Sequence, residues 1–199
     1  MSLFGKKEKE SNNVLDKIIR LRGTVPTIES GTVMQKIINP CQLNEYLYKG
    51  KTNVTGWASK AADISPWARN LDEGVRNARL DYFIPNRTLP GTYDGNDFKR
   101  AINNGEDMYV LRFMTVTTPD NTMYPKADEY NRPPCTGTGF TASSEHLIPE
   151  FTYSMRPDGT VNQLGVEISS GAIFKINPQS EECLIAMWDE IVGHFIPVE

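Results

Sequence analysis

The stretch of this chain best suited to chemistry is residues 137–144, Gly-Thr-Gly-Phe-Thr-Ala-Ser-Ser. It places four hydroxyl side chains and two glycines around one aromatic ring. Glycines allow a ligand to approach the backbone closely, and hydroxyl groups both donate and accept hydrogen bonds. The composition therefore suits binding of a sugar or a phosphate group. It is also typical of a surface turn, because Gly, Ser and Thr favour turns for conformational reasons.

Cysteine and metal chemistry have less support in the sequence. The three cysteines are widely spaced and form no Cys-x-x-Cys pair, which indicates reduced thiols rather than a disulfide framework (Cys41, Cys135 and Cys183). With only His146 and His194 present, a His-rich zinc site is not expected and no metal is predicted. A hydrolase that used Cys135 or Ser143 as its nucleophile would need the fold to bring a histidine close to it.

Charge and hydropathy narrow the classes of partner. The net charge of -4 and the pI near 5.3 argue against binding of a nucleic-acid backbone, which requires clustered Lys and Arg. The mean hydropathy is -0.44, and no apolar run is long enough to span a membrane. The lysines near the N-terminus are not followed by the apolar stretch of a signal peptide. We therefore expect a protein that is cytoplasmic, or exported by a route without a Sec signal peptide.

The order of predicted elements indicates an α+β fold. Caps and apolar periodicity predict helices over residues 11–23, 32–38, 66–80, 98–103 and 180–192. Extended segments are predicted at 108–116, 138–143, 150–155, 161–168 and 172–176, with a long polar loop over 118–137. We expect a mostly antiparallel, split or twisted sheet with N-terminal helices and one C-terminal helix. Residues 1–10 are predicted to be a disordered polar tail, and residues 11–199 a single domain.

The strand with the strongest signal is 108–116. Its residues are nearly all apolar, aromatic or β-branched, and only Arg112 interrupts them. A run of this kind is typical of a central strand that is buried on both faces. We therefore expect Val110 and Phe113 to lie in the core. Trp67 and Trp188 fall on helical stripes and are also predicted to be core residues.

Four separated pieces of the chain resemble, in their order, the ADP-ribosyltransferase fold of bacterial toxin and effector domains. A strand-like Tyr-Leu-Tyr-Lys-Gly at 46–50 comes first, and Gly-Phe-Thr-Ala-Ser-Ser at 139–144 comes second. Val-Glu-Ile at 166–168 and Gly-Ala-Ile-Phe-Lys-Ile at 171–176 come last. The first piece is similar to the family's early strand with a basic residue, and the second to its Gly-Phe-x-Ser-Thr-Ser-like strand. The last pieces are similar to its glutamate strand, which comes before a Pro-Gly-x-x-Phe-x-Val strand. The family has arginine where Lys49 stands, and its Glu-x-Glu or Gln-x-Glu pair is not found at the expected distance.

The resemblance implies that the chain binds NAD in a cleft between two small sheets, and that it transfers or hydrolyses the ADP-ribose of NAD. Lys49 would then hold a phosphate or ribose of the cofactor. The hydroxyl stretch would orient the nicotinamide half, through Phe140, Thr141 and Ser143. The catalytic residue would be Glu167, whose carboxylate stabilises positive charge as the nicotinamide leaves. A protein target or an immunity-type partner is implied as well.

A non-catalytic α+β module that binds other proteins accounts for the same features in another way. Acidic charge, few Cys and His residues and the polar loop 118–137 suit protein binding equally well. Glu167 alternates with Val166 and Ile168, which is also the pattern of a solvent-facing residue on an ordinary strand. Because a ligand stabilises only a protein that binds it, thermal stability with and without NAD distinguishes the two hypotheses.

Overall fold

The computed structural model describes residues 24–26, 28–78, 80, 93–116, 141, 146–153 and 165–198, and the structural statements below concern these residues. The predicted tail 1–10, the predicted helix 11–23, the loop 118–137 and the site residues Phe140 and Ser143 lie outside them. Within the described ranges the chain forms a mostly antiparallel sheet of eight strands with four α-helices. The α+β class predicted from the sequence is therefore confirmed.

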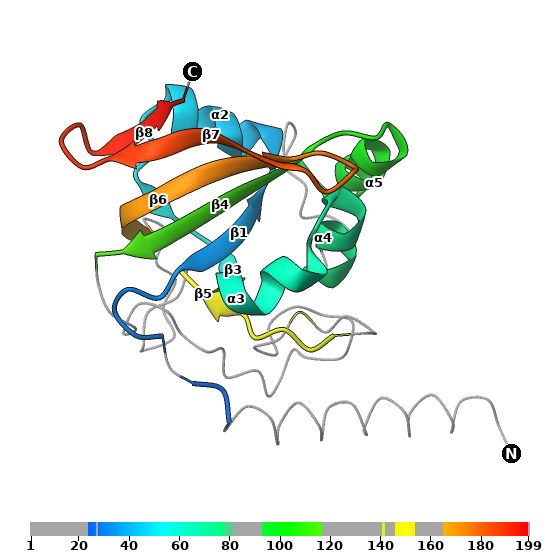
Figure 1. The fold of residues 1–199 in the computed structure, drawn as a ribbon, viewed down its shortest axis with the longest axis horizontal. Coiled ribbons are helices and arrows are strands. Elements are labelled where there is room, and N and C mark those ends of the chain that lie inside the picture. Colours follow the sequence, from blue (N-terminus) through cyan, green and yellow to red (C-terminus); the bar gives the residue numbers. More distant parts are fainter. Residues whose placement is uncertain are drawn as a thin grey trace, which may run out of the picture.

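The sheet has the strand order β5-β3-β1-β4-β6-β7-β8, with β2 paired to β6 off this path, and Figure 1 shows its twist. All of the strand pairs are antiparallel. The strands are β1 (Met34–Ile38), β2 (Asn53–Val54), β3 (Trp57–Lys60), β4 (Met108–Thr115), β5 (Phe151–Thr152), β6 (Val166–Ile176), β7 (Glu182–Asp189) and β8 (His194–Pro197).

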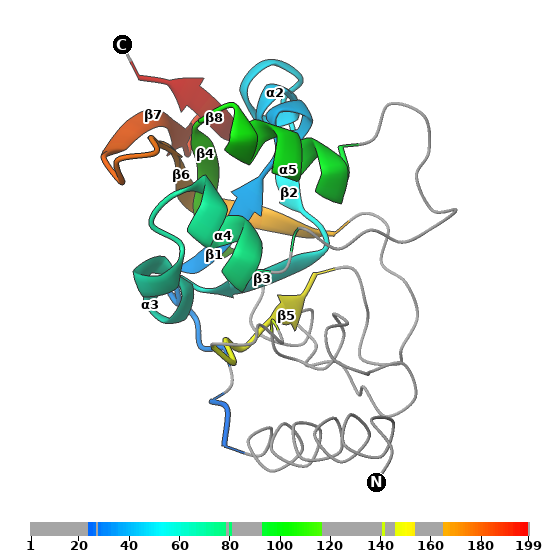
Figure 2. The same ribbon diagram turned by 90° about the vertical axis from the view of Figure 1, so that its right-hand side faces the viewer.

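Helices cover the sheet on both faces. They are α2 (Pro40–Tyr48), α3 (Ala61–Ile64), the 3-10 helix η1 (Ser65–Trp67), α4 (Leu71–Asn77) and α5 (Gly95–Asn103). The helices α4 and α5 lie in front of β1 and β4 in Figure 2 and enclose a helix-side core with Val110 and Ile176. On the opposite face, Tyr46 of α2 joins an α2-side core with Phe113 and Phe195.

The prediction for the central strand is confirmed. β4 lies between β1 and β6, and Val110 and Phe113 are 0% and 1% exposed. Val110 packs in the helix-side core and Phe113 in the α2-side core, so both faces of the strand are buried. Phe113 meets Tyr153 edge to face, with the ring centroids 5.4 Å apart. This strand holds the two halves of the sheet together.

The helix predicted over 32–38 is wrong, because the segment forms β1. Its apolar residues occur in adjacent pairs, and that spacing resembles a helical stripe. They are buried because β1 pairs with β3 on one side and with β4 on the other. The helix α2 follows β1, and Asn39 is its N-cap. The Asn39 side chain accepts a hydrogen bond from the Gln42 backbone, and the Gln42 side chain accepts one from the Asn39 backbone.

The single C-terminal helix predicted over 180–192 is also wrong. This part of the chain forms β7 and most of the turn that leads into β8, and the two strands pair as a hairpin. Ser180 cannot cap a helix here, since its φ of +69° lies in the left-handed region. Ala186 and Trp188 of β7 pack in the α2-side core, whereas Leu184 and Met187 are exposed, so the apolar residues that resemble a helical stripe do not share one buried face. His194 lies on β8, not at a helix end.

Other predicted elements are real but have different bounds. The predicted helix 66–80 is divided into η1 and α4, because Asn70 caps α4 by accepting a hydrogen bond from the Glu73 backbone. The predicted strand 172–176 and the last three residues of the predicted strand 161–168 belong to one long strand, β6, whereas 161–164 lie outside the described residues. The predicted segment 150–155 contains the short strand β5. The structure describes only Thr141 from the predicted strand 138–143, and this residue is not in a strand.

Candidate functional site

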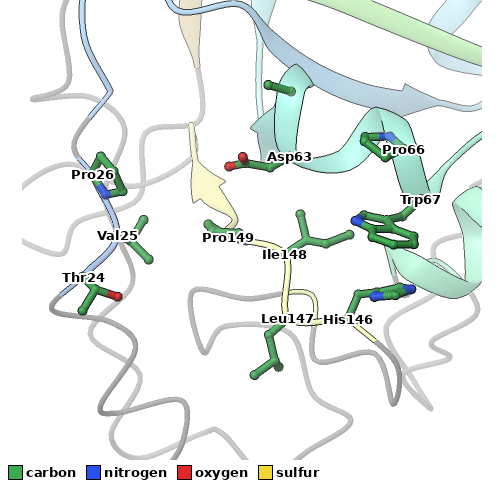
Figure 3. Close-up of a pocket in the computed structure, with 11 residues that line it drawn as sticks. Thr24, Val25, Pro26, Asp63, Pro66, Trp67, His146, Leu147, Ile148 and Pro149 are labelled. Atoms are coloured by element: carbon green, nitrogen blue, oxygen red, sulfur yellow. The ribbon is translucent and has the colours of Figure 1, made fainter.

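An open pocket of about 650 Å³ lies beside α3 and η1 (Figure 3). Its walls come from three parts of the chain, which are 24–26, the α3–η1 turn and 146–149. We call it the outer pocket. A cavity of this size is in the range that accommodates a small-molecule ligand.

Aromatic stacking forms one wall of the outer pocket. The rings of Trp67 and His146 are parallel to within 22°, and their centroids are 3.7 Å apart. Trp67 ends η1, and its carbonyl accepts a hydrogen bond of 2.7 Å from the Asn77 side chain, which fixes the backbone. The Trp67 side chain is 43% exposed, so the prediction that it is a core residue is wrong. The pocket thus offers a large, oriented aromatic surface to solvent.

The rest of the outer pocket combines apolar side chains with two polar ones, the Thr24 hydroxyl and one carboxylate. Pro26, Pro66 and Pro149 contribute rigid apolar surface, and Asp63 of α3 contributes the carboxylate (Figure 3). No Lys or Arg is among the described residues that line the pocket. The chemistry favours a ligand with a planar aromatic group and a positive charge, because both stacking and the carboxylate attract such a group.

Thr141 connects the hydroxyl stretch of the sequence to this pocket. It is 0% exposed, and its backbone N–H donates to the Ile148 carbonyl at 2.9 Å. Its Oγ1 lies 3.5 Å from the carbonyl of His146 and donates to it. The Thr141 hydroxyl is therefore directed to the backbone behind the pocket wall. It holds the wall in place and is not itself presented to a ligand.

A second, smaller cavity of about 180 Å³ lies at Glu150, at the end of the same 146–150 segment. We call it the inner cavity. The β1–β3 pairing ends at Gln35 and Ser59, and residues of both strands line the cavity next to that end. Lys36 of β1 lines it together with Glu150. Since 146–149 line the outer pocket and Glu150 lines the inner cavity, one segment contributes to both.

The inner cavity brings an amine and a carboxyl group together. The Lys36 ammonium donates to the Trp57 carbonyl at 3.1 Å. A Cβ at Gly56, where φ is +76°, would lie 3.2 Å from Lys36 Nζ, so a side chain there would crowd the ammonium. Glu150 is 5% exposed, and its Oε2 atom has no hydrogen-bond partner in the described part of the chain.

Burial moves both groups toward their neutral forms. Desolvation lowers the pKa of Lys36 to about 8, although the nearby Glu150 charge acts in the opposite direction. Desolvation likewise raises the pKa of Glu150 to about 8, with Lys36 opposing it. Two groups that change protonation near neutral pH in one cavity are a feature of sites that handle protons, and also of some structural pairs.

The other predicted site residues lie elsewhere. Lys49 is the exposed C-cap of α2, so the strand-like reading of 46–50 is wrong. Glu167 is exposed on β6, opposite Asn53 of β2. The chain just after Lys49 runs beside the glutamate, since the Ile168 N–H donates to the Thr52 carbonyl. Neither Lys49 nor Glu167 is among the residues that line the two cavities.

Sequence reasoning did not select the residues that line the cavities as a site. The sequence does contain a signal for two of them. Lys36 is the only charged residue in the strand Met-Gln-Lys-Ile-Ile, and Glu150 is the only one in Leu-Ile-Pro-Glu-Phe. A single charge inside an apolar run is a candidate for burial, which makes it a candidate for a shifted pKa. Trp67 and His146 carried no comparable signal, because they are far apart in the sequence.

Comparisons of the chain with protein-family models, with curated proteins and with solved structures give no match. Among the residues described, no helix has the length and apolar character needed to cross a membrane. In the same ranges, no three His, Cys, Asp or Glu side chains are arranged to hold a metal ion.

Proposed function

We propose that this protein binds NAD in the outer pocket and breaks the bond between its nicotinamide and ribose. The observation that carries the proposal is the exposed Trp67–His146 stack in a pocket of about 650 Å³ that also has a carboxylate, Asp63. The nicotinamide of NAD is a planar ring with a positive charge. Trp67 attracts such a ring by stacking and cation–π contact, and Asp63 attracts its charge.

The attachment of Thr141 to the 146–148 backbone holds one wall of the proposed site in place. Nicotinamide departs as a neutral molecule with the electron pair of the C–N bond. The ribose carbon is left with positive charge until a nucleophile, from a protein or from water, adds to it and releases a proton. A fixed carboxylate stabilises that charge. In this geometry Asp63 is the carboxylate within the outer pocket, whereas the family resemblance implies Glu167.

NAD binding is tested by the thermal stability of the full chain with increasing NAD. A ligand at about 100 times its Kd stabilises the folded state by about 2.7 kcal/mol. We expect Trp67→Ala to abolish this gain. Tyr48→Ala is the matched control, because Tyr48 is an aromatic residue that is 73% exposed on α2 and does not line the outer pocket. A wild-type protein that NAD does not stabilise at millimolar concentration would refute the proposal.

The catalytic step is tested by release of nicotinamide. We expect Asp63→Asn to lower turnover at least about 100-fold, since removal of one charge-stabilising group commonly has an effect of that size. Glu167→Gln tests the residue that the resemblance implies. Loss of turnover in Glu167→Gln with normal turnover in Asp63→Asn would assign the role to Glu167. Normal turnover in both variants would contradict a carboxylate mechanism at either position.

A further inference from the structure

The β7–β8 hairpin carries an apolar surface that is exposed in the described structure. Six of the ten exposed large hydrophobic residues lie on it, although it is a small part of the chain. They are Leu184, Met187, Ile191, Val192, Ile196 and Val198. Isolated exposed apolar residues are normal in soluble proteins, whereas a concentration of them marks an interaction surface.

Two of these side chains, those of Met187 and Ile196, are on the face of the hairpin that points away from α2, and Ile191 and Val192 lie in the turn. Met187 and Ile196 are direct cross-strand partners, so their side chains share a face, and they are 53% and 39% exposed. Trp188 and Phe195 form the next pair and belong to the α2-side core, with ring centroids 5.2 Å apart. No residue of β7 or β8 is among those of the helix-side core in the described chain. The helices α4 and α5 thus cover β1 and β4 and leave the hairpin uncovered (Figures 1 and 2).

Among the strands that the structure describes, β8 also ends the sheet. It pairs with β7 on one side, and the strand order ends there. The backbone groups along the outer side of an edge strand are available to an added strand. Pro197 lacks an N–H, which is tolerated at an edge and limits how far an added strand can pair. Among the described strands, the other two that pair on one side, β2 and β5, have only two residues each and offer far less.

Charge indicates what would bind there. Residues 176–199 contain no Lys or Arg, and the acidic residues Glu181, Glu182, Asp189 and Glu190 lie at the two ends of β7. Arg112 pairs with Glu182 at 2.6 Å, which leaves the other three without a basic partner among the ion pairs of the described residues. A second copy of this chain would bring like charges together, whereas a basic partner would complement them.

We propose that β8 is a docking edge for an extended segment of another protein, with apolar side chains flanked by Lys or Arg. The segment adds to the sheet beside β8, its apolar side chains cover Met187 and Ile196, and one of its basic ends lies near Asp189 and Glu190, where β7 turns into β8. This inference is independent of the NAD site, because none of these residues lines either cavity.

The probe is a fluorescein-labelled peptide, Lys-Lys-Val-Thr-Ile-Thr-Val-Lys-Lys, whose binding to the full chain is followed by fluorescence anisotropy. We expect saturable binding that weakens as salt is added, since exposed charges are screened. Replacement of every Lys of the peptide by Glu should weaken binding at least about 10-fold, and so should methylation of alternate backbone amides.

Ile196→Lys and Met187→Lys each place a positive charge on the surface and should weaken peptide binding at least about 10-fold. Val33→Lys is the matched control, because Val33 is 44% exposed outside the hairpin. Circular dichroism establishes that each variant is folded, and both positions are exposed enough to accept lysine. No binding of the basic peptide, equal binding of the acidic peptide, or unchanged binding by both hairpin variants would overturn the proposal. Concentration-dependent dimerisation lost in Ile196→Lys would also overturn it, because the occupant would then be a second copy of this chain.

Discussion

Lys36 and Glu150 lie in one cavity, and burial moves their pKa values toward each other, to about 8 for each. Their charges attract, but desolvation is the larger effect at both groups. Removal from water commonly costs a buried ion pair as much as the attraction returns. The pair therefore makes the free energy of unfolding depend on pH. It does not stabilise the fold as a salt bridge would.

The free energy of unfolding is expected to have a local minimum near pH 8. Glu150 keeps its proton in the folded state from its usual pKa of 4.5 up to about 8, while the unfolded chain loses it, so stability falls as pH rises through this window. Lys36 loses its proton in the folded state at about 8, while the unfolded chain keeps it up to 10.5, so stability rises again above pH 8. Urea unfolding at a series of pH values measures both slopes.

Variants assign the two slopes to these groups. Glu150→Gln should remove the fall in stability below pH 8, and Lys36→Met should remove the rise above it. Glu29→Gln and Lys99→Met, at exposed positions, are the controls and should leave the profile unchanged. A profile that keeps both slopes in the two cavity variants would show that other groups cause them.

Gly165→Ala should destabilise the fold more than Gly193→Ala. Both glycines have a positive φ, +69° and +74°, so alanine brings similar backbone strain at each. A Cβ at Gly165 would overlap the Val54 carbonyl, whereas nothing lies within 4 Å of a Cβ at Gly193. The overlap should add about 1–3 kcal/mol to the loss of stability, as measured by urea unfolding. Equal losses would mean that β2 can move away from β6 without cost.

Phe113→Ala should lower the free energy of unfolding by about 3–5 kcal/mol, as expected for a core aromatic residue. Phe113 is 1% exposed and packs against Tyr153. Val116→Ala is the control just beyond the same strand, because Val116 is 61% exposed, and it should change stability by less than about 0.5 kcal/mol. A loss below about 1 kcal/mol for Phe113→Ala would contradict the central position of β4.

Asn39→Ala should cost about 1 kcal/mol of stability, because it removes the side chain that caps α2. Asn44→Ala changes the same residue type in the middle of the helix at an exposed position and should be neutral or slightly stabilising. Thermal unfolding followed by circular dichroism compares the two. Similar effects of both substitutions would show that the Asn39–Gln42 capping contacts contribute little.

Sequence patterns predicted the parts of the fold that depend on local composition. β4 is predictable because a short, nearly unbroken run of apolar, aromatic and β-branched residues is typical of a strand buried on both faces. The patterns at β1 and β7 predict helices instead, because short apolar segments fit both periods and the strand partners are distant in sequence or follow a turn. β1 is extended since β3 and β4 satisfy its backbone, and no local pattern contains that information.

The site was harder to predict for a related reason. Thr141 was selected for its hydroxyl, yet the hydroxyl is turned to the backbone of 146–148. Lys49 was expected on a strand and lies at the end of α2, because the cap at Asn39 starts a helix that extends to Tyr48. The Trp67–His146 stack and the Lys36–Glu150 pair each join residues that are far apart in the chain. Contacts of this kind depend on tertiary structure and not on spacing.

The position of β4 has a consequence for the order of folding. Its pairings with β1 and β6 join Ile38 to Tyr109 and Thr115 to Ile168, so each closes a long loop. β6, β7 and β8 follow one another with short turns and need much less loop closure. We therefore expect these three strands to assemble first and refolding to be slow, on a scale of roughly milliseconds to seconds. Until β4 adds, the surface of β6 that later packs against Phe113 stays open to solvent, and the early intermediate is the state most prone to aggregation.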